Sequence, residues 1–265
     1  MSDSLAKTVL VERRADGVAF VTLNRPALHN AFNEAMIAAL TDAVAALGRE
    51  EGVRALVLRA EGKSFSAGAD LDWMKRMAAY GPEENLADAR ALARLMRALN
   101  DCPKPTIARV QGAAFGGGVG LVACCDMAVA AEGAQFCLSE VRLGLIPAVI
   151  SPYVIAAMGA RAARRWFLTA ERFDAAEALR NGLLHQVTPP DGLDAAVEAW
   201  LARLGEGAPG AQAEAKALIF AVAGHPLSEA LEEDTARRIA RRRAAPEGRE
   251  GVAAFLEKRA PVWGV

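Results

Sequence analysis

The 265-residue sequence has few of the residues on which metal and redox sites depend. It contains four cysteines and three histidines, and aromatic residues make up 6% of the chain. No two cysteines stand at a C-x-x-C spacing, so neither a zinc site nor a redox disulfide is predicted, and the cysteines are expected to be small core residues. No apolar run approaches the roughly 20 residues that a membrane-spanning helix needs.

The sequence also lacks an excess of charge of either sign. Its 31 Lys and Arg residues stand against 32 Asp and Glu residues, for a formal net charge of −1. That balance gives no field to attract nucleic acid or an anionic membrane. One basic cluster, residues 237–243, is predicted to be an exposed helix face balanced by nearby acids; its alternative is a phosphate or subunit contact. Residues 1–4 lack the layout of a signal peptide, so a cytoplasmic protein is expected.

Predicted strands and helices alternate along most of the chain, which indicates an α/β fold. Apolar and β-branched runs predict strands at residues 9–13, 18–23, 53–58, 106–110, 126–130 and 136–138. Helices are expected at residues 33–47, with Asn33 as the cap, and at 71–80, 83–100, 117–124, 193–204, 211–222, 227–244 and 248–259. We therefore predict an α/β core over residues 1–200 and a helical carboxy-terminal region over residues 201–265.

Two glycine-rich segments about fifty residues apart carry the strongest functional signal. The first runs from Ser64 to Asp70 and the second from Gly112 to Gly120, and each lies between a predicted strand and a predicted helix. Such turns leave backbone N–H groups without partners at the start of a helix. Two of them side by side can hold one oxygen atom in an oxyanion hole. The pattern therefore predicts an acyl-transfer or enolate-forming enzyme.

Each segment also has an alternative interpretation. Asp70 can simply cap the following helix, and three consecutive glycines can serve tight packing. Residues 118–123 fit the dinucleotide-binding fingerprint, but they lie several residues after the strand at 106–110 rather than in the first turn. A Ser–His–Asp triad stays open, although the chain has no G-x-S-x-G elbow.

Glu140 is the candidate acid–base group. It is the only acid in the largely apolar run 136–150, and burial would raise the pKa of its carboxyl group toward the range useful for proton transfer. The alternatives are a surface acid paired with Arg142 and a glutamate that caps a helix.

Together these motifs resemble the crotonase (enoyl-CoA hydratase/isomerase) superfamily. The match covers nearly the whole chain in family order, through segments 23–32, 65–70, 112–118, 125–126, 136–147 and 255–261. The resemblance implies a spiral of ββα units with a helical carboxy-terminal part, assembled as a homotrimer or a dimer of trimers. It also implies an acyl-CoA substrate, with CoA as part of that substrate and no separate cofactor or metal.

The resemblance further implies roles for individual residues. The amides of Ala69 and Gly117 would form the oxyanion hole for the thioester carbonyl, and Glu140 would be the catalytic acid–base. The positions that would bind the CoA part are Arg25, Ala27, Leu28, Ala67, Gly68, Asp70 and Leu71, with Phe255 and Lys258 contributed by a neighbouring subunit.

Two departures from the family pattern bear on the reaction. The resemblance places a second glutamate where this chain has Gly120, and a single acid is the pattern of 3-enoyl to 2-enoyl isomerases. In the second departure, residues 147–152 replace the glycine-rich run that many members carry. Together with residues 115–120, 124–127 and 136–140, this stretch resembles bacterial methylglutaconyl-CoA and carboxygeranoyl-CoA hydratases of leucine and terpene breakdown. We therefore expect a hydratase of a 2-enoyl-CoA with a branched or carboxylated acyl chain. The alternatives are the isomerase and an acyl-CoA-binding member with weak catalysis. Arg94 and Arg142 are candidate partners for a substrate carboxylate, or else ordinary solvated side chains.

Overall fold

The computed structural model describes residues 7–263, so the predicted absence of a signal peptide at residues 1–4 lies outside the described residues. A six-stranded sheet in the order β1-β2-β3-β4-β6-β9 forms the centre of the fold. Strands β1 (Val9–Arg13) and β2 (Val18–Leu23) occur at the predicted residues and form an antiparallel hairpin. The following strands pair in parallel: β3 (Ala55–Ala60), β4 (Thr106–Val110), β6 (Met127–Ala131) and β9 (Gln186–Thr188).

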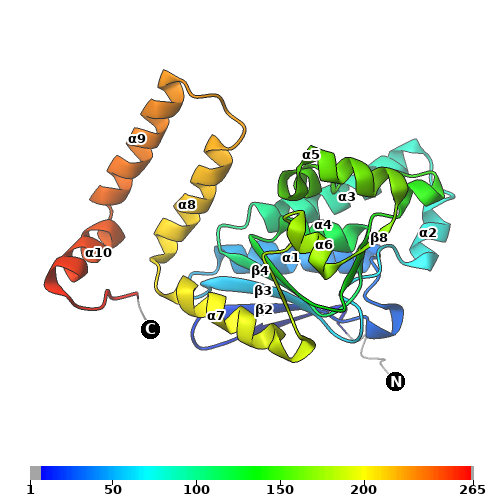
Figure 1. Ribbon diagram of the computed structural model, residues 1–265, viewed down its shortest axis with the longest axis horizontal. Coiled ribbons are helices and arrows are strands. Elements are labelled where there is room, and N and C mark those ends of the chain that lie inside the picture. The colour runs from blue at the N-terminus through cyan, green and yellow to red at the C-terminus, as the bar shows by residue number, and fades with distance from the viewer. Residues whose placement is uncertain (1–6, 264–265) are drawn as a thin grey trace.

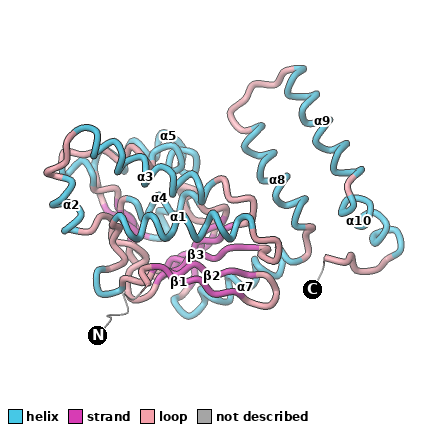
Figure 2. The backbone as a smooth tube through the Cα atoms, turned by 180° about the vertical axis from the view of Figure 1, so that it is seen from behind, coloured by secondary structure: helices cyan, strands magenta, loops and turns pink. Residues whose placement is uncertain are grey.

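Helices cover both faces of this sheet. Helices α1 (Glu34–Arg49) and α3 (Pro82–Asn100) lie over one face and α7 (Leu193–Gly205) over the other, as Figures 1 and 2 show. Alternate side chains of β3 enter the two resulting cores: Leu56 and Leu58 join the large cluster with α1, and Ala55 and Val57 join the cluster with α7. Burial on both faces is why this strand reads as a continuous apolar run.

Asn33 starts α1 as predicted. Its side-chain oxygen accepts a hydrogen bond from the Met36 amide at 3.0 Å, which satisfies one of the free N–H groups of the first turn. The helix then buries one apolar stripe that includes Leu40, Val44 and Leu47. This helix end lies beside the first glycine-rich segment, because Phe32 pairs with Ala69 in an isolated parallel bridge.

A second, three-stranded sheet carries the rest of the site. Its order is β5-β7-β8, with β5 (Ala114–Phe115), β7 (Gln135–Cys137) and β8 (Arg172–Asp174). Strand β5 leads into α4 (Gly117–Cys124), and β7 leads into the 3-10 helix η2 (Glu140–Leu143). The pairing of β5 with β7 therefore brings the second glycine-rich segment and Glu140 to neighbouring strand ends.

Four further short or irregular helices complete the core. They are η1 (Pro26–Leu28), α2 (Leu71–Met77), α5 (Ser151–Thr169) and α6 (Ala175–Arg180), with the turn η3 (Pro190–Gly192) before α7. Helix α5 is interrupted at Gly159, where φ is 76°. All four cysteines are buried and unpaired, in agreement with the prediction of core residues.

The last three helices form an arm that stands away from the core (Figures 1 and 2). They are α8 (Pro209–Val222), α9 (Glu229–Ala244) and α10 (Pro246–Glu257). Because α7 packs on the sheet through residues such as Leu201, the change from core to arm falls between α7 and α8, and the predicted boundary at residue 200 lies within α7. In the basic cluster, Arg237 and Arg238 pair with Glu233 and Asp234 one helical turn earlier. Across residues 7–263 the structure contains no helix long and apolar enough to cross a membrane.

Candidate active site

The three predicted site segments lie side by side. The first glycine-rich loop bonds to the segment before α1 on one edge, since Phe32 N–H donates to the Gly68 carbonyl at 2.7 Å and Asp70 N–H donates to the Phe32 carbonyl at 2.8 Å. On its other side the loop bonds to β5, where Phe115 N–H donates to the Ser66 carbonyl at 2.8 Å. The loop is therefore held between two backbone segments that are distant from it in sequence.

This pairing leaves the Ala69 amide free. The bridge with Phe32 uses the Gly68 carbonyl and the Asp70 amide, which flank Ala69, so the Ala69 N–H points to the opposite edge. Within the described part of the chain, this amide donates no hydrogen bond. A free N–H on a fixed loop is the kind of donor that an oxyanion hole requires.

The second free amide belongs to Gly117, the first residue of α4. Its N–H has no acceptor among residues 7–263, because the first N–H groups of a helix have no partner in the helix itself. The preceding residue, Gly116, has φ 50° and ψ −117°, a backbone conformation that only glycine adopts easily. A Cβ built on Gly68 would lie 3.4 Å from the Phe115 carbonyl oxygen, so the two glycine turns are in contact.

Glu140 lies beside this pair of turns. Its Oε1 is 3.2 Å from the position that a Cβ on Gly116 would take, and its buried Oε2 has no hydrogen-bond partner in the described residues. Burial raises the pKa of the Glu140 carboxyl, while its own backbone amide opposes the rise. No cation and no second carboxylate in residues 7–263 contributes to that shift. Among these residues Glu140 forms no ion pair with Arg142, which was the alternative interpretation.

The space beside Gly120 is filled by apolar side chains. A Cβ at this position would overlap the Cγ2 of Ile150, and it would lie 2.9 Å from the Ile150 Cβ and 3.2 Å from the Met96 Sδ. Ile150 is 3% exposed and precedes the first turn of α5. A carboxylate side chain at position 120 would therefore displace Ile150, so the described residues leave no room for a second acid at this position.

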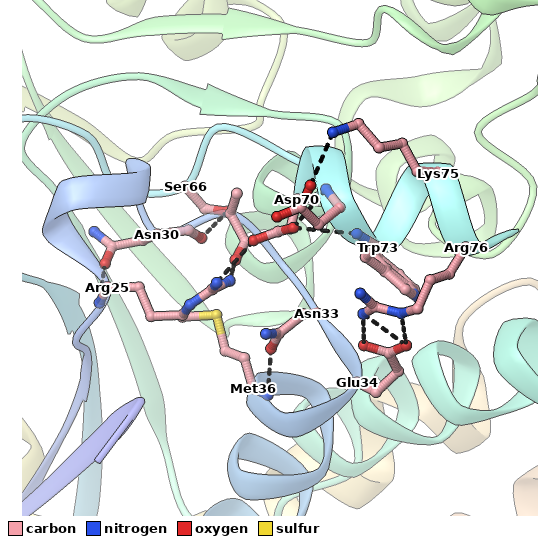
Figure 3. Close-up of polar contacts among 12 residues, drawn as sticks. Arg25, Asn30, Asn33, Glu34, Met36, Ser66, Asp70, Trp73, Lys75 and Arg76 are labelled. Atoms are coloured by element: carbon pink, nitrogen blue, oxygen red, sulfur yellow. Dashed lines mark hydrogen bonds and ion pairs between the residues drawn. The ribbon is translucent and has the colours of Figure 1, made fainter. Parts of the chain in front are cut away.

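The predicted CoA-binding residues divide into two groups. Those before residue 80 lie together, because η1 and the first glycine-rich loop are joined by hydrogen bonds, including Ala67 N–H to the His29 carbonyl at 2.9 Å. Within this group Ala27, Leu28 and Leu71 are exposed, whereas Arg25 and Asp70 are mostly covered and pair with each other at 2.7 Å (Figure 3).

Phe255 and Lys258 form the second group. Phe255 is 82% exposed on α10, and Lys258 ends that helix with a positive φ of 55°. Helix α10 and helix α2 lie at opposite ends of the molecule in both views (Figures 1 and 2). One chain therefore does not bring these two residues to the site, and their contact with CoA from a neighbouring subunit stays a prediction.

The described residues form neither of the two alternative sites, the Ser–His–Asp triad and the dinucleotide-binding turn. His29 bonds to Ser64 at 3.1 Å and His185 accepts from the Ala128 amide. Because no hydrogen bond among the described residues joins a ring of His29, His185 or His225 to a carboxylate, no Ser–His–Asp triad forms there. For the dinucleotide fingerprint, β5 lies between the end of β4 and the start of α4, so the glycines do not follow β4 directly.

Two residues that shape the site were given no role by the sequence. Asn30 is fully buried, accepts from the Arg25 amide, and donates to the carbonyls of Glu61 and Ser64. It therefore ties η1 to the first glycine-rich loop. Ile150 fills the space beside Gly120. The sequence carried a signal for Asn30, because an asparagine within an apolar stretch needs hydrogen-bond partners when it is buried. The contact made by Ile150 could not be predicted, because it depends on the packing of α4 against α5.

Comparisons with known proteins identify the family to which this chain is similar. A family model described as enoyl-CoA hydratase/isomerase matches residues 13–265. An enoyl-CoA hydratase structure from Shewanella pealeana is 49% identical, with a TM-score of 0.95 over 98% of this chain and 97% of that one. Pseudomonas aeruginosa AtuE is 42% identical, with a TM-score of 0.93 over 97% and 100%. Enoyl-CoA hydratase AKT6-1 of Alternaria alternata is 36% identical over 250 residues, which cover 92% of this chain and 80% of the relative.

Proposed function

The chain belongs to the enoyl-CoA hydratase/isomerase family, and from this premise we propose that it adds water reversibly to a 2-enoyl-CoA thioester with a branched or carboxylated acyl chain. The observation that carries the proposal is the Glu140 carboxyl group beside two free amides, with its Oε2 buried and without a hydrogen-bond partner among the described residues. The names of the hydratase relatives from Shewanella pealeana and Alternaria alternata support the same reaction type.

The two amides would stabilise the charge that develops during the reaction. Addition of water at C3 moves electron density onto the thioester oxygen, which becomes enolate-like. Hydrogen bonds from the Ala69 and Gly117 N–H groups would hold that oxygen, and the loss of one such donor typically costs about 3–4 kcal/mol in the barrier. Because both donors belong to backbone fixed by neighbouring segments, little reorganisation is needed when the charge appears.

One carboxyl group can complete the proton balance. A neutral carboxylic acid carries a proton on one oxygen and an acceptor lone pair on the other. As water bonds to C3, one Glu140 oxygen accepts the proton lost by water and the other delivers its proton to C2, so the carboxyl group ends neutral. Burial favours this neutral form by raising the pKa of Glu140.

A carboxylated acyl chain fits the single-acid site. Ile150 fills the position where the resemblance places a second glutamate, so the protein has no acid there to orient water. A carboxylate on the substrate would supply the missing acceptor. The resemblance of residues 115–127, 136–140 and 147–152 together to hydratases of carboxylated substrates supports this assignment.

The same single acid favours a second candidate, the 3-enoyl to 2-enoyl isomerase. In that reaction Glu140 in its charged form would take a proton from C2 and return it to C4, and no water would be activated. The burial of Gly120 against Ile150 is the specific observation behind this alternative.

Product analysis separates the two reactions. The enzyme is incubated with 2-enoyl-CoA and 3-enoyl-CoA thioesters, linear and carboxylated, while the absorbance of the conjugated thioester and the mass of the product are followed. The proposal expects loss of conjugation and a hydroxyacyl-CoA from the 2-enoyl substrate, faster for the carboxylated one. Gain of conjugation from the 3-enoyl substrate without hydroxyacyl-CoA would replace the hydratase by the isomerase. Tight CoA binding without turnover of either substrate would favour the binding role, and full activity of Glu140→Ala would remove Glu140 from the mechanism.

We propose also that the arm joins copies of this chain into a homotrimer or a dimer of trimers. Apolar side chains on the arm are exposed in the single chain, with Leu227 88%, Phe255 82% and Leu256 73% exposed. Such a surface is unusual for a monomer. Native mass spectrometry should show multiples of three chains, and a monomer at micromolar concentration would contradict the assembly.

A further inference from the structure

Arg25 bonds to the protein chain through both its side chain and its backbone. Its Nη2 donates to Oδ2 of Asp70 at 2.7 Å and its Nη1 donates to the Ala31 carbonyl at 2.5 Å, while its backbone N–H donates to Asn30. The side chains of Arg25 and Asp70 are 14% and 10% exposed. Figure 3 shows the guanidinium group directed into this cluster. An arginine held in this way has little surface left for a phosphate.

Asp70 has two further bonds that fix its position. Its Oδ1 accepts from the amides of Asp72 at 2.9 Å and Trp73 at 3.1 Å, which caps α2. Its own N–H donates to the Phe32 carbonyl at 2.8 Å. The residue that follows Ala69 is therefore fixed through both its backbone and its carboxylate.

The guanidinium group of Arg25 spans the two segments that flank the free amide. Its Nη2 bonds to the carboxylate of Asp70, the residue directly after Ala69. Its Nη1 bonds to the carbonyl of Ala31, the residue directly before Phe32. Phe32 and Ala69 are themselves bridge partners. The fork thus clamps both sides of the bridge that turns the Ala69 N–H away from Phe32.

We propose that Arg25 and Asp70 form a positioning pair that fixes the Ala69 amide for the thioester oxygen, and that Arg25 is not a ligand of the CoA phosphates. This inference rests on the proposed function, because it gives the Ala69 amide a role only if a thioester carbonyl binds there. It replaces the direct CoA-binding role that the resemblance implied for Arg25 and Asp70. A planar fork with two separate acceptors is a geometry that lysine does not reproduce.

The first test is the variant Arg25→Lys with two forms of the same enoyl thioester, one on CoA and one on pantetheine, which lacks the nucleotide and its phosphates. A positioning residue affects the reaction step, so kcat should fall about 10- to 100-fold for both substrates, with KM changed by less than about threefold. A rise in KM for the CoA substrate alone, with kcat kept, would identify Arg25 as a phosphate ligand and overturn the proposal.

Two variants accompany this test. Asp70→Asn keeps an oxygen that can cap α2 but removes the charge that holds Arg25, so it should show the same loss of kcat on both substrates even where Arg25→Lys folds poorly. Arg76→Lys is the matched control, because Arg76 of α2 pairs with Glu34 at 2.7 Å on the surface and not beside Ala69. The control should keep wild-type kcat. Equal losses in all three variants would mean a general loss of structure and would overturn the specific role.

The infrared stretch of a ¹³C-labelled thioester carbonyl provides a readout that overall stability does not move. A saturated acyl-CoA bound to the wild type should show a lowered carbonyl frequency, because two N–H groups polarise the bond. In Arg25→Lys and Asp70→Asn this shift should become smaller, and it should be unchanged in Arg76→Lys. An undiminished shift in both pair variants would overturn the positioning role. No shift in the wild type would instead refute the oxyanion hole on which the proposed function depends, so the two failures are distinguishable.

Discussion

Replacing Gly120 by alanine would add one methyl group to a space that Ile150 already fills. The new Cβ would overlap the Cγ2 of Ile150 and lie 2.9 Å from its Cβ, an atom that cannot rotate away because it is bonded to the backbone. Such overpacking costs about 1–3 kcal/mol. Alanine in a helix offsets about 1 kcal/mol of this through its better helix propensity. We therefore expect Gly120→Ala to lower the free energy of unfolding by about 1 kcal/mol.

The cost of this substitution should shrink when Ile150 is shortened. Ile150→Ala alone should cost about 2–5 kcal/mol, because it leaves a cavity in a buried position. In that background the overlap with Cγ2 is gone, although the Cβ of residue 150 remains 2.9 Å from the new methyl group. The overpacking that remains, about 1 kcal/mol, is offset by the propensity gain of about 1 kcal/mol, so Gly120→Ala should be nearly neutral there. The coupling between the two positions should thus be about 1 kcal/mol, within the range for residues in contact.

Urea unfolding of the four proteins, at one protein concentration and followed by far-ultraviolet circular dichroism, measures this cycle. Fixed concentration matters because assembly adds to the apparent stability. If Gly120→Ala changed the free energy of unfolding by the same amount in both backgrounds, within about 0.5 kcal/mol, the two positions would be independent. That result would refute the statement that Ile150 occupies the space beside Gly120, and with it the structural reason for a single acid.

Three other expectations concern charge. Glu140→Gln should raise Tm at neutral pH. Because the pKa of Glu140 is raised in the folded protein, its contribution to the free energy of unfolding is fully present below pH 4.5, the ordinary pKa, and is lost as pH rises through the folded pKa. A Tm difference between the two proteins that stayed constant between about pH 4 and pH 8 would contradict this. Hydration by the wild type should fall as pH rises through that same pKa, since the neutral acid delivers the proton, and a rate that increases there would exclude this role. Lys216→Met removes the partner of Asp126, 2.8 Å away between α8 and the core, so Tm should fall by a few degrees and proteolysis between α7 and α8 should accelerate; unchanged cleavage would show that the arm is held otherwise.

Much of the fold was predictable because its signals are local. The hairpin of β1 and β2 and the strand β4 occur at the predicted residues, and Asn33 caps α1 as its side-chain chemistry requires. Other boundaries moved by a few residues, as for β3, which begins at Ala55 rather than at residue 53. The short strands β8 and β9 were not predicted. Each has three residues and exists through its partner strand, so no local periodicity marks it.

The site was predictable in its members but not in its contacts. Glycine-rich turns and a lone acid in an apolar run are local patterns, and the structure brings those segments together. The pairing of Arg25 with Asp70 joins residues 45 positions apart and depends on a bridge between segments far apart in the chain. A sequence shows that an arginine and an aspartate are present, but burial and fork geometry decide whether they bind a ligand or each other.

A backbone hydrogen bond links the segment that carries Glu140 to the turn that carries the Gly117 amide. Gly116 N–H donates to the Cys137 carbonyl at 2.9 Å, which joins the turn before Gly117 to the strand that ends three residues before Glu140. The hydrogen-bond donors of the site are uncharged amides, so their strength does not change with pH. Asp70, the other acid at the two turns, is paired with Arg25, whereas Glu140 has no ion pair among the described residues and no neighbouring charge shifts the pKa of its carboxyl. The charge state of the site is therefore set by burial of one carboxyl group, and any substrate carboxylate that binds beside Glu140 would raise its pKa further and favour the neutral form that donates the proton.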